Sequence, residues 1–272
     1  MARLKMELSE EGFTDREVAA YWDRNADVWT DQVRKGWDIF REYFNNPLFL
    51  RFVGDVSGRS MLDAGCGEGR NTRILAMLGA RMIGVDVSGR MIEYARQREQ
   101  ETGLGIRYEH TSYSDLSCFA DASFDRVVSF MALMDGPGYE GALAEIHRVL
   151  RPGGDLCFSI LHPCFMTRGF GWILSDQGEK IKLTTSHYFD DQSWVEEWKF
   201  TAARDMEDIA PFAIPSFPRT LSYYVNGLIQ AGFVLAKIEE ARPTEAMAAT
   251  HPWLKCWHEH GSLFIYFQGF KS

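Results

Sequence analysis

LDAGCGEG, residues 62–69, decides the fold of this chain, because a short apolar run ends at an acid and is followed by closely spaced glycines. Glycine stands at every second position: Gly65, Gly67 and Gly69. Glycines at the end of a predicted strand allow a tight turn and leave the backbone bare, so that a ligand can lie against it. The stretch therefore predicts a strand, a ligand-binding turn and the start of a helix.

Strand and helix patterns alternate on both sides of this turn. We expect strands at 60–65, 81–88, 106–112, 124–130, 155–161, 234–240 and 262–270, and helices at 69–80, 88–100, 139–150 and 220–233. Such alternation specifies a parallel sheet covered by helices. The predicted fold class is α/β, with a Rossmann-like, seven-stranded, mostly parallel sheet and helices on both faces.

Two segments lie outside this alternation. From Thr14, which forms a capping-box pattern with Glu17, the sequence predicts one or two N-terminal helices. Residues 163–219 are rich in aromatic residues, and two alternating runs within them, 180–189 and 193–200, are expected to form a hairpin. The predicted divisions are an N-terminal helical cap at 1–55, a cofactor-binding core at 56–162, a lid or substrate insertion at 163–219 and the C-terminal part of the core at 220–272.

Composition narrows the partners and the location. Of the 272 residues 46% are hydrophobic, which is ample for a packed core. A formal net charge of -9 disfavours nucleic acid as a partner. The five cysteines are scattered without a C-x-x-C pair, and no apolar run resembles a signal segment or reaches membrane-spanning length. We therefore expect a cytoplasmic protein that binds neither nucleic acid nor membrane.

The glycine spacing separates two kinds of nucleotide site. A dinucleotide fold favours G-x-G-x-x-G, whereas this turn has G-x-G-x-G followed by Arg70. The pattern instead resembles motif I of the class I S-adenosylmethionine-dependent methyltransferases. The resemblance continues in GVDVS (84–88), DASFDRVVSFMALMD (121–135) and HRVLRPGGDLCFS (147–159), covering residues 60–162 and, more loosely, 218–270. It implies S-adenosyl-L-methionine as the cofactor.

The resemblance also assigns cofactor roles to individual residues. Asp63 would organise the loop and position the cofactor's ammonium group, and Asp86 would accept hydrogen bonds from both ribose hydroxyls. Ser112 stands where the family often has an acid facing the adenine amine. The other implied contacts are Gly65, Cys66, Gly67, Val87, Tyr113, Phe130 and Tyr21. Strand-end capping by the two aspartates, and plain packing by Ser112 and the aromatic residues, are the alternatives.

A candidate catalytic base follows the strand expected at 155–161. His162 stands at the sheet edge where α/β proteins bind ligands, although it could equally serve only to anchor the strand end. Cys164, after a proline, suggests the thiolate of cytosine methyltransferases, but a small packed cysteine is the better interpretation. WHEH at 257–260 has H-x-H spacing without a third ligand, so no metal is predicted.

Aromatic residues of the cap and the insertion indicate the kind of acceptor. Trp22, Phe165 and Tyr188 are expected to line its pocket, because aromatic walls suit an apolar or planar compound. We expect methylation of a small molecule at oxygen, nitrogen or carbon, in natural-product or quinone-like metabolism. The alternatives are an RNA or tRNA methyltransferase, a dinucleotide oxidoreductase and a non-catalytic S-adenosylmethionine-binding protein. The cap and insertion are also expected to form a lid, or to mediate homo-oligomer contacts.

Overall fold

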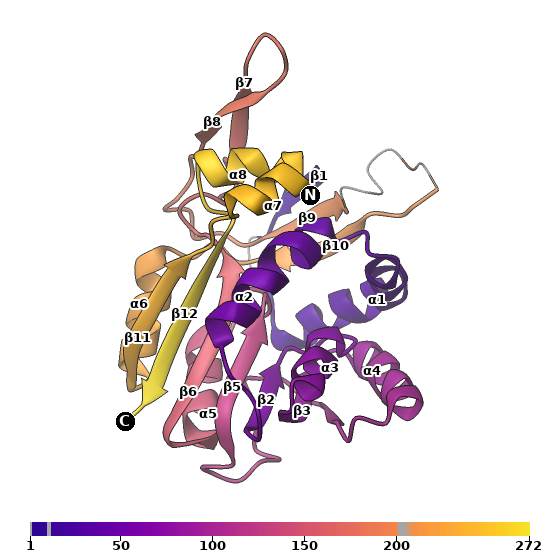
Figure 1. Ribbon diagram of the computed structural model, residues 1–272, viewed down its shortest axis with the longest axis vertical. Coiled ribbons are helices and arrows are strands. Elements are labelled where there is room, and N and C mark those ends of the chain that lie inside the picture. The colour runs from indigo at the N-terminus through magenta and orange to yellow at the C-terminus, as the bar shows by residue number, and fades with distance from the viewer. Residues whose placement is uncertain (1, 10–11, 201–205, 207) are drawn as a thin grey trace.

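A seven-stranded sheet forms the centre of the computed structural model, which describes residues 2–9, 12–200, 206 and 208–272 (Figure 1). Its strand order is β11–β12–β6–β5–β2–β3–β4. The strands are β2 (Ser60–Ala64), β3 (Arg81–Asp86), β4 (Arg107–His110), β5 (Phe124–Phe130), β6 (Leu150–Leu161), β11 (Phe233–Glu240) and β12 (Phe264–Lys271). β12 runs antiparallel to its two neighbours, and the other pairings are parallel. The predicted seven-stranded, mostly parallel α/β fold is confirmed.

The reversal of strand order positions the site. From β2 the chain continues through β3 to β4 on one side of the sheet, and then returns to β5 on the other side. The carboxyl ends of β2 and β5 therefore border a crevice, and α/β proteins bind ligands at this place. The glycine turn begins directly after β2.

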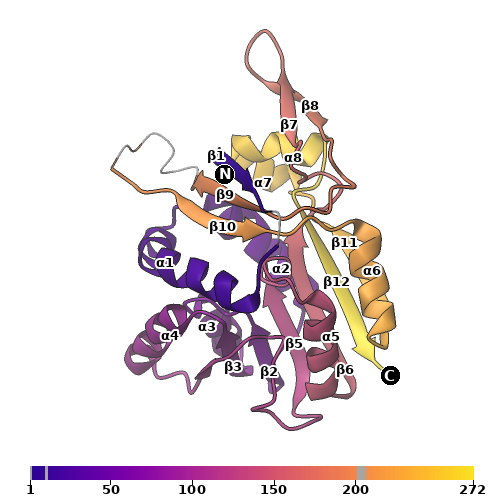
Figure 2. The same cartoon turned by 180° about the vertical axis from the view of Figure 1, so that it is seen from behind.

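Helices cover both faces of the sheet. One face carries α2 (Asn46–Val53), α3 (Arg70–Met77) and α4 (Gly89–Thr102), and the opposite face carries α5 (Tyr139–Val149) and α6 (Leu221–Gln230), as Figures 1 and 2 show from the two sides. The Ser88 hydroxyl oxygen accepts a hydrogen bond from the Met91 N–H and caps α4. The four helices expected after residue 60 are confirmed.

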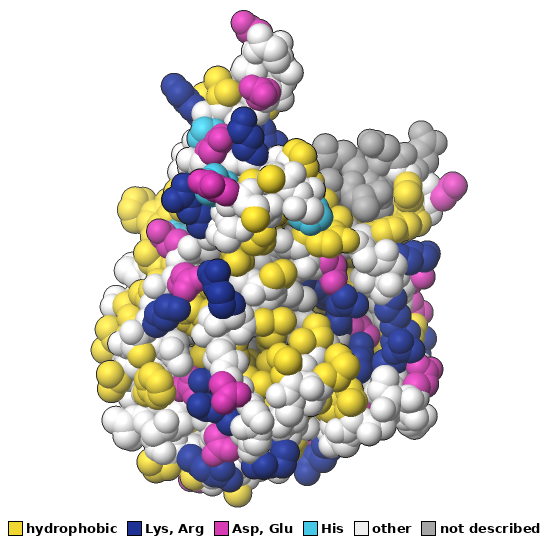
Figure 3. All heavy atoms as spheres, in the orientation of Figure 1, with side chains coloured by type: hydrophobic (Ala, Val, Ile, Leu, Met, Phe, Trp, Pro, Cys, Tyr) yellow, Lys and Arg dark blue, Asp and Glu magenta, His cyan; other side chains and the backbone are white. Residues whose placement is uncertain are grey.

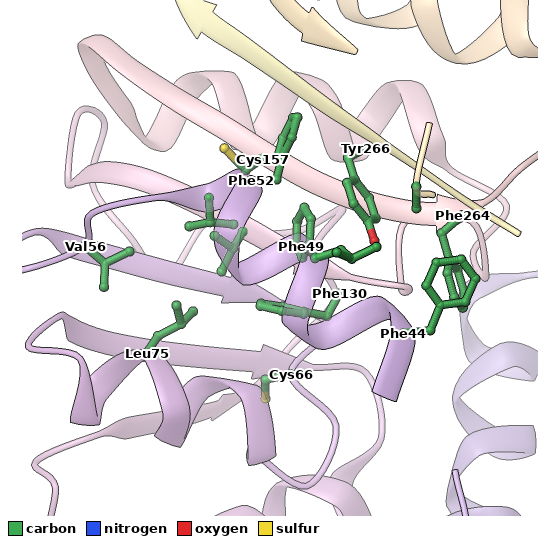
Figure 4. Close-up of a cluster of buried hydrophobic side chains, with 14 of the residues drawn as sticks. Phe44, Phe49, Phe52, Val56, Cys66, Leu75, Phe130, Cys157, Phe264 and Tyr266 are labelled. Carbon is green, nitrogen blue, oxygen red and sulfur yellow. The ribbon is translucent and has the colours of Figure 1, made fainter. Parts of the chain in front are cut away.

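A buried apolar cluster fills the space between α2 and the sheet (Figure 4). Phe49 of α2 packs edge-on against Phe130 at the end of β5, with ring centroids 4.8 Å apart. The same Phe49 ring lies 5.0 Å from the ring of Tyr266 in β12. This packing fixes the carboxyl end of β5, next to the crevice.

The N-terminal segment is helical from the predicted capping box onward. The Thr14 amide donates to Glu17 Oε2 at 2.8 Å, and the Glu17 amide donates to Thr14 Oγ1 at 3.3 Å. These bonds begin α1 (Asp15–Arg34), and a π-helical turn (Arg41–Asn45) leads into α2. The expectation of a purely helical cap is wrong at its start, where β1 (Ala2–Leu8) forms a strand.

A second sheet joins the N-terminal segment to the insertion. Its order is β1–β9–β10, with β9 (Trp194–Lys199) in the middle and β10 (Phe212–Ser216) at the other edge, and both pairings are antiparallel. We call these three strands the lid sheet. Its Trp198 and Phe212 pack in one buried cluster with Val33 of α1.

The hairpin predicted between 180–189 and 193–200 is wrong. Both runs contain strands, but β8 (Lys180–Thr184) pairs with β7 (Gly171–Leu174), and β9 pairs within the lid sheet. Alternation identifies a strand with one buried face and does not name its partner. Residues 201–205 and 207 of the predicted insertion lie outside the described residues.

The connection between β11 and β12 is partly helical. It contains α7 (Glu245–Thr250), a 3-10 turn (Pro252–Leu254) and α8 (Lys255–Glu259). Figure 3 shows acidic and basic side chains interspersed over the visible face. Among the helices that the structure describes, none is both long and apolar enough to cross a bilayer.

Candidate active site

A cavity of about 510 Å³ lies between the carboxyl ends of the strands and the lid sheet. The strand ends contribute the carboxyl groups of Asp63 and Asp86, and α1 and the lid sheet contribute four tryptophans, with Glu196 and Ser216 as polar members. Its wall includes Asp63, Asp86, Phe130 and Leu161 from the central sheet, Trp22 and Trp29 from α1, and Trp194, Trp198 and Ser216 from the lid sheet. One end is therefore suited to a polar ligand and the other to an apolar one.

The glycine turn is shaped by positive backbone angles. Gly65 has φ of +83°, and a Cβ added there would lie 2.2 Å from the Cβ of Ala132. Gly67 has φ of +55°, and an added Cβ would meet no protein atom within 4 Å. Both residues line the cavity. The turn thus allows close packing against the loop after β5 and leaves open space for a ligand above Gly67.

Asp63 lies near the end of β2, two positions before Gly65, and is only 1% exposed. Its Oδ2 accepts a hydrogen bond from the Thr72 hydroxyl at 2.6 Å, while Oδ1 has no partner within the described part of the chain. Burial raises the pKa of the Asp63 carboxyl to about 7, and the charge of Asp86 adds to the shift. A cationic ligand group would relieve this unfavourable burial.

Asp86 ends β3 and ties the turn to that strand. One of its oxygens accepts from the Gly67 amide at 2.8 Å, and the other accepts from the Ser88 amide at 2.9 Å. Burial raises the pKa of the Asp86 carboxyl, against these two hydrogen bonds. Each carboxylate oxygen has a second lone-pair direction, so the group can also accept from ligand hydroxyls.

A charged cluster borders the turn on the side of α2. Arg41 and Arg70 both line the cavity. Glu42 connects them, since Arg70 Nη2 pairs with it and Arg41 Nη2 lies 3.7 Å from its Oε1. Arg41 Nε and Nη2 make no hydrogen bond to any described residue. These donors are available to a ligand carboxylate.

The groups around the turn fit S-adenosyl-L-methionine. Asp63 Oδ1 needs a donor that the ammonium group would supply, and Arg41 needs an acceptor that the carboxylate would supply. The space above Gly67 can hold the methionine part. Asp86 stands at the end of the second strand of the motif, where the ribose hydroxyls would lie.

The structure brings most of the predicted cofactor residues to one cavity. The lining includes Asp63, Gly65, Cys66, Gly67, Asp86, Val87, Tyr113 and Phe130. Ser112 and Tyr21 are not among the residues of the wall. The Ser112 hydroxyl accepts from the Ser114 amide at 3.1 Å, and the Tyr21 ring lies 4.3 Å below the Arg24 guanidinium. Their contact with the cofactor stays a prediction, and the geometry gives it no support.

His162 is buried and lies outside the cavity wall. Its Nε2 lies 2.8 Å from Glu240 Oε1, and its Nδ1 accepts a hydrogen bond from the Cys164 amide at 3.2 Å. Burial lowers the pKa of His162, partly offset by Glu240. With both ring nitrogens engaged, the geometry favours the anchoring role over the predicted role of base, which stays untested.

Of the predicted acceptor residues, Trp22 and Tyr188 line the cavity and Phe165 does not. The Phe165 ring packs on His162 with centroids 4.5 Å apart. The Cys164 thiol points to the Tyr188 hydroxyl at 3.8 Å. Across the described ranges, no group of three or more histidine, cysteine or acidic side chains could hold a metal ion.

Sequence reasoning missed several polar residues of the wall, among them Arg41, Asp135 and Arg219. Asp135 is the last residue of the motif-like stretch 121–135, so its position after β5 was a usable signal. Arg219 ends the predicted insertion without any local motif. Its approach to the loop after β5 depends on tertiary packing.

Known proteins show the same fold and motifs. A family model described as a methyltransferase domain matches residues 62–158. An uncharacterised protein of Haemophilus influenzae is 27% identical over 205 residues, which are 73% of this chain and 76% of the relative. A ubiquinone biosynthesis O-methyltransferase of Hahella chejuensis is 31% identical over 139 residues, 48% of this chain. The match spans 58% of that relative, less than two thirds of its length.

Solved structures of methyltransferases have the same fold as this chain. An S-adenosylmethionine-dependent methyltransferase of Mesorhizobium loti superposes with a TM-score of 0.66 at 26% identity, covering 83% of this chain and 96% of that one. An enzyme described in similar terms from Listeria monocytogenes has a TM-score of 0.66 at 21% identity, covering 82% and 95%, and shares the fold. The chain therefore carries a methyltransferase domain and shares the fold and motifs of the class I S-adenosylmethionine-dependent methyltransferases, whose cofactor is S-adenosyl-L-methionine.

Proposed function

We propose that this enzyme transfers the methyl group of S-adenosyl-L-methionine to a small, largely apolar or aromatic molecule, at oxygen, nitrogen or carbon. The observation that carries the proposal is the division of the cavity into a polar end at the glycine turn and an aromatic end under the lid sheet. Trp22, Trp194 and Trp198 supply flat apolar surface at the second end. Such walls suit a planar acceptor.

The residues at the polar end hold the cofactor. Gly67 leaves room for its methionine part, Asp63 would bind the ammonium group, and Asp86 would bind the ribose. When bound, the cofactor supplies a methyl group on a sulfonium centre. The protein then has to align the acceptor with that methyl group and exclude water.

The lid sheet and α1 are suited to exclude water. Trp29 contacts Trp198, Phe200 and Phe212, with ring centroids 5.2 to 5.6 Å apart. We propose that the two segments expected from the sequence to cover the core, 1–55 and 163–219, close over it and exclude water. Association of subunits through these segments remains a further proposal.

Relatives support a small acceptor. The Hahella relative is named for ubiquinone biosynthesis, so its name points to a quinone-type compound. A net charge of -9 works against an RNA substrate. The described cysteines carry no disulfide, which is in keeping with the proposed cytoplasmic location.

Radiolabelled methyl transfer tests the proposal. The purified chain is incubated with methyl-labelled S-adenosyl-L-methionine and three panels: phenols with catechols, nitrogen heterocycles, and indoles as carbon acceptors. Bulk tRNA forms a separate arm, and Asp63→Asn serves as the binding-deficient control. We expect methylation of at least one small-molecule panel. Methylation of tRNA alone would favour the RNA alternative, and cofactor binding without any transfer would favour the non-catalytic one.

A further inference from the structure

Asp135 differs from every other acid of the cavity wall. Within the described part of the chain its carboxyl group makes no hydrogen bond, although the residue is half-buried and lines the cavity. Asp63 and Asp86 are bound to the glycine turn and its helix, and Glu68 pairs with Arg73. Asp38 and Glu196 also have partners. A half-buried carboxyl group that lines the cavity and makes no hydrogen bond to the protein is free to accept one from a ligand.

The loop that carries Asp135 lies against the cofactor turn. This loop, 131–136, follows β5 directly. Ala132 is the residue that an added Cβ on Gly65 would strike, at 2.2 Å. The Tyr113 hydroxyl donates to the Ala132 carbonyl at 3.2 Å and fixes the loop from the opposite side. Asp135 is therefore held in the same wall as the methionine end of the cofactor site.

Arg219 clamps the loop on both sides of Asp135. Its Nη1 donates to the carbonyls of Leu133 and Met134 at 3.5 and 3.3 Å, and its Nη2 donates to those of Gly136 and Pro137. The guanidinium also lies 5.4 to 5.8 Å from the ring centroids of Tyr139, Phe217 and Tyr223. Its donors serve the backbone, so the carboxylate of Asp135 stays free for another partner.

The charges around Asp135 suit a group that exchanges a proton near neutral pH. Burial raises the pKa of its carboxyl to about 8, a net value in which Arg219 opposes the shift and Asp86 adds to it. Two tyrosines, Tyr113 and Tyr224, also face it, and burial raises the pKa of both phenols, so they stay neutral. A general base works best when its pKa is close to the working pH.

We propose that Asp135 is the catalytic base of this methyltransferase and that Arg219 is the positioning residue that holds it. The proposal rests on the proposed function and narrows it: the acceptor carries an O–H or N–H group. The bond from sulfur to the methyl carbon breaks with its electron pair left on sulfur. A bond from the acceptor oxygen or nitrogen to that carbon forms, and the acceptor proton moves to the Asp135 carboxylate.

The test compares Asp135→Asn with wild type on the three acceptor panels. We expect wild type to methylate phenols, catechols or N–H heterocycles, with kcat/KM rising with pH and levelling off near pH 8. Asp135→Asn should lower kcat by about 10²- to 10⁴-fold and remove the rising limb. Its affinities for S-adenosyl-L-methionine and S-adenosyl-L-homocysteine, measured by calorimetry, should both stay within about threefold of wild type.

Three further variants separate catalysis from folding. Asp121→Asn, at a side chain that is 78% exposed, is the matched control and should leave the rate and pH profile unchanged. Arg219→Ala removes a cation that lowers the pKa of Asp135, so its rising limb should move to higher pH. Arg219→Lys keeps the charge and should restore the limb toward the wild-type position. A merely structural role for Arg219 would leave the limb in place in every folded variant.

Four results would overturn the assignment. An Asp135→Asn rate within threefold of wild type, with the pH limb intact, would show that no proton goes to Asp135. A selective loss of affinity for S-adenosyl-L-methionine over S-adenosyl-L-homocysteine would make it a sulfonium contact instead. Methylation of indole carbon alone would preserve the proposed function and reject the base. Absence of transfer to any panel, with cofactor bound, would reject both.

Discussion

A Cβ on Gly65 would lie 2.2 Å from the Cβ of Ala132, so the cofactor turn and the loop after β5 are packed as closely as their backbones permit. The Gly65 amide also donates to the Val85 carbonyl at 2.9 Å. The turn is thereby held between β3 on one side and the loop that follows β5 on the other. Its shape is set before any ligand arrives, which lowers the ordering cost of binding.

Gly67→Ala should weaken cofactor binding more than it weakens folding. The new Cβ would meet no protein atom within 4 Å and would occupy cofactor space, and φ of +55° costs roughly 1–2 kcal/mol for alanine. We expect at least a tenfold loss of affinity, by calorimetry. Gly58→Ala is the matched control, because Gly58 has φ of +70° and equally open surroundings and does not line the cavity. Equal affinity in the two variants would count against cofactor contact at Gly67.

Cofactor affinity should rise with pH between about 5.5 and 8. The pKa of Asp63 is about 7 in the folded protein, above the usual aspartate value of about 3.9, so below pH 7 the cofactor ammonium must displace a proton. Asp63→Asn should flatten this dependence and lower affinity by roughly 10- to 100-fold. Calorimetry across the pH range checks both effects. A wild-type slope that survives in the variant would assign the titration to another group.

Without cofactor, the same shift predicts an opposite effect on folding. Because the folded pKa of Asp63 is raised, the folded state binds more protons between about pH 4 and 7, and its stability falls as pH rises through that window. Asp63→Asn should therefore gain stability relative to wild type as the pH rises from 5 to 8. Urea denaturation of both proteins at the two pH values measures the difference. A constant difference would mean that Asp63 is ionised throughout.

Asp155→Ala should strongly destabilise the sheet. Asp155 and Arg126 are cross-strand partners in β6 and β5, both buried, with Arg126 Nη2 2.9 Å from Asp155 Oδ2. Removing one member leaves a buried charge unpaired, at a cost of about 3–5 kcal/mol. The pair lies near the amino end of β5, away from the cavity. The Asp155→Ala variant, once folded, should therefore keep its cofactor affinity. Replacing both residues with apolar ones should cost less than the single change.

His162→Asn should change stability more than turnover. The pKa of His162 is lowered by burial, so the unfolded chain binds more protons below about pH 6.5 and wild-type stability falls there. Removing the imidazole should reduce that fall and leave kcat within about threefold. Parallel melts at pH 5.5 and 7.5, with one rate assay, separate the two roles. A drop of two or more orders of magnitude in kcat would restore His162 as the base.

The core of the fold could be predicted because its signals are local. Ser88 caps α4 through a bond to a residue three positions away, and the Gly65 and Gly67 turn follows its strand directly. These features depend on short-range sterics and hydrogen bonding. Asp63 and Asp86, the acids predicted to bind the cofactor, could also be found from local signals because they stand at strand ends.

The pairing of the lid strands and the position of the proposed base depend on distant residues. β9 takes β1 and β10 as neighbours, and nothing in its alternation names either of them. His162 stands at a strand end like Asp86, but its ring turns toward Glu240 of β11 instead of the cavity. Arg219 reaches four carbonyls of a loop more than 80 positions earlier in the chain.

The place of β1 in the lid sheet affects how the protein can be handled. The first residues of the chain form one edge of the sheet that roofs the acceptor end, whereas the C-terminus leaves β12 at the far end of the molecule (Figures 1 and 2). An affinity tag fused before β1 would begin at the edge of the lid sheet. It would compete for the unpaired backbone N–H and C=O groups of that edge strand. During synthesis, β1 is made well before β9 and has to wait for that strand before it gains a partner. A tag placed after β12 keeps clear of both events.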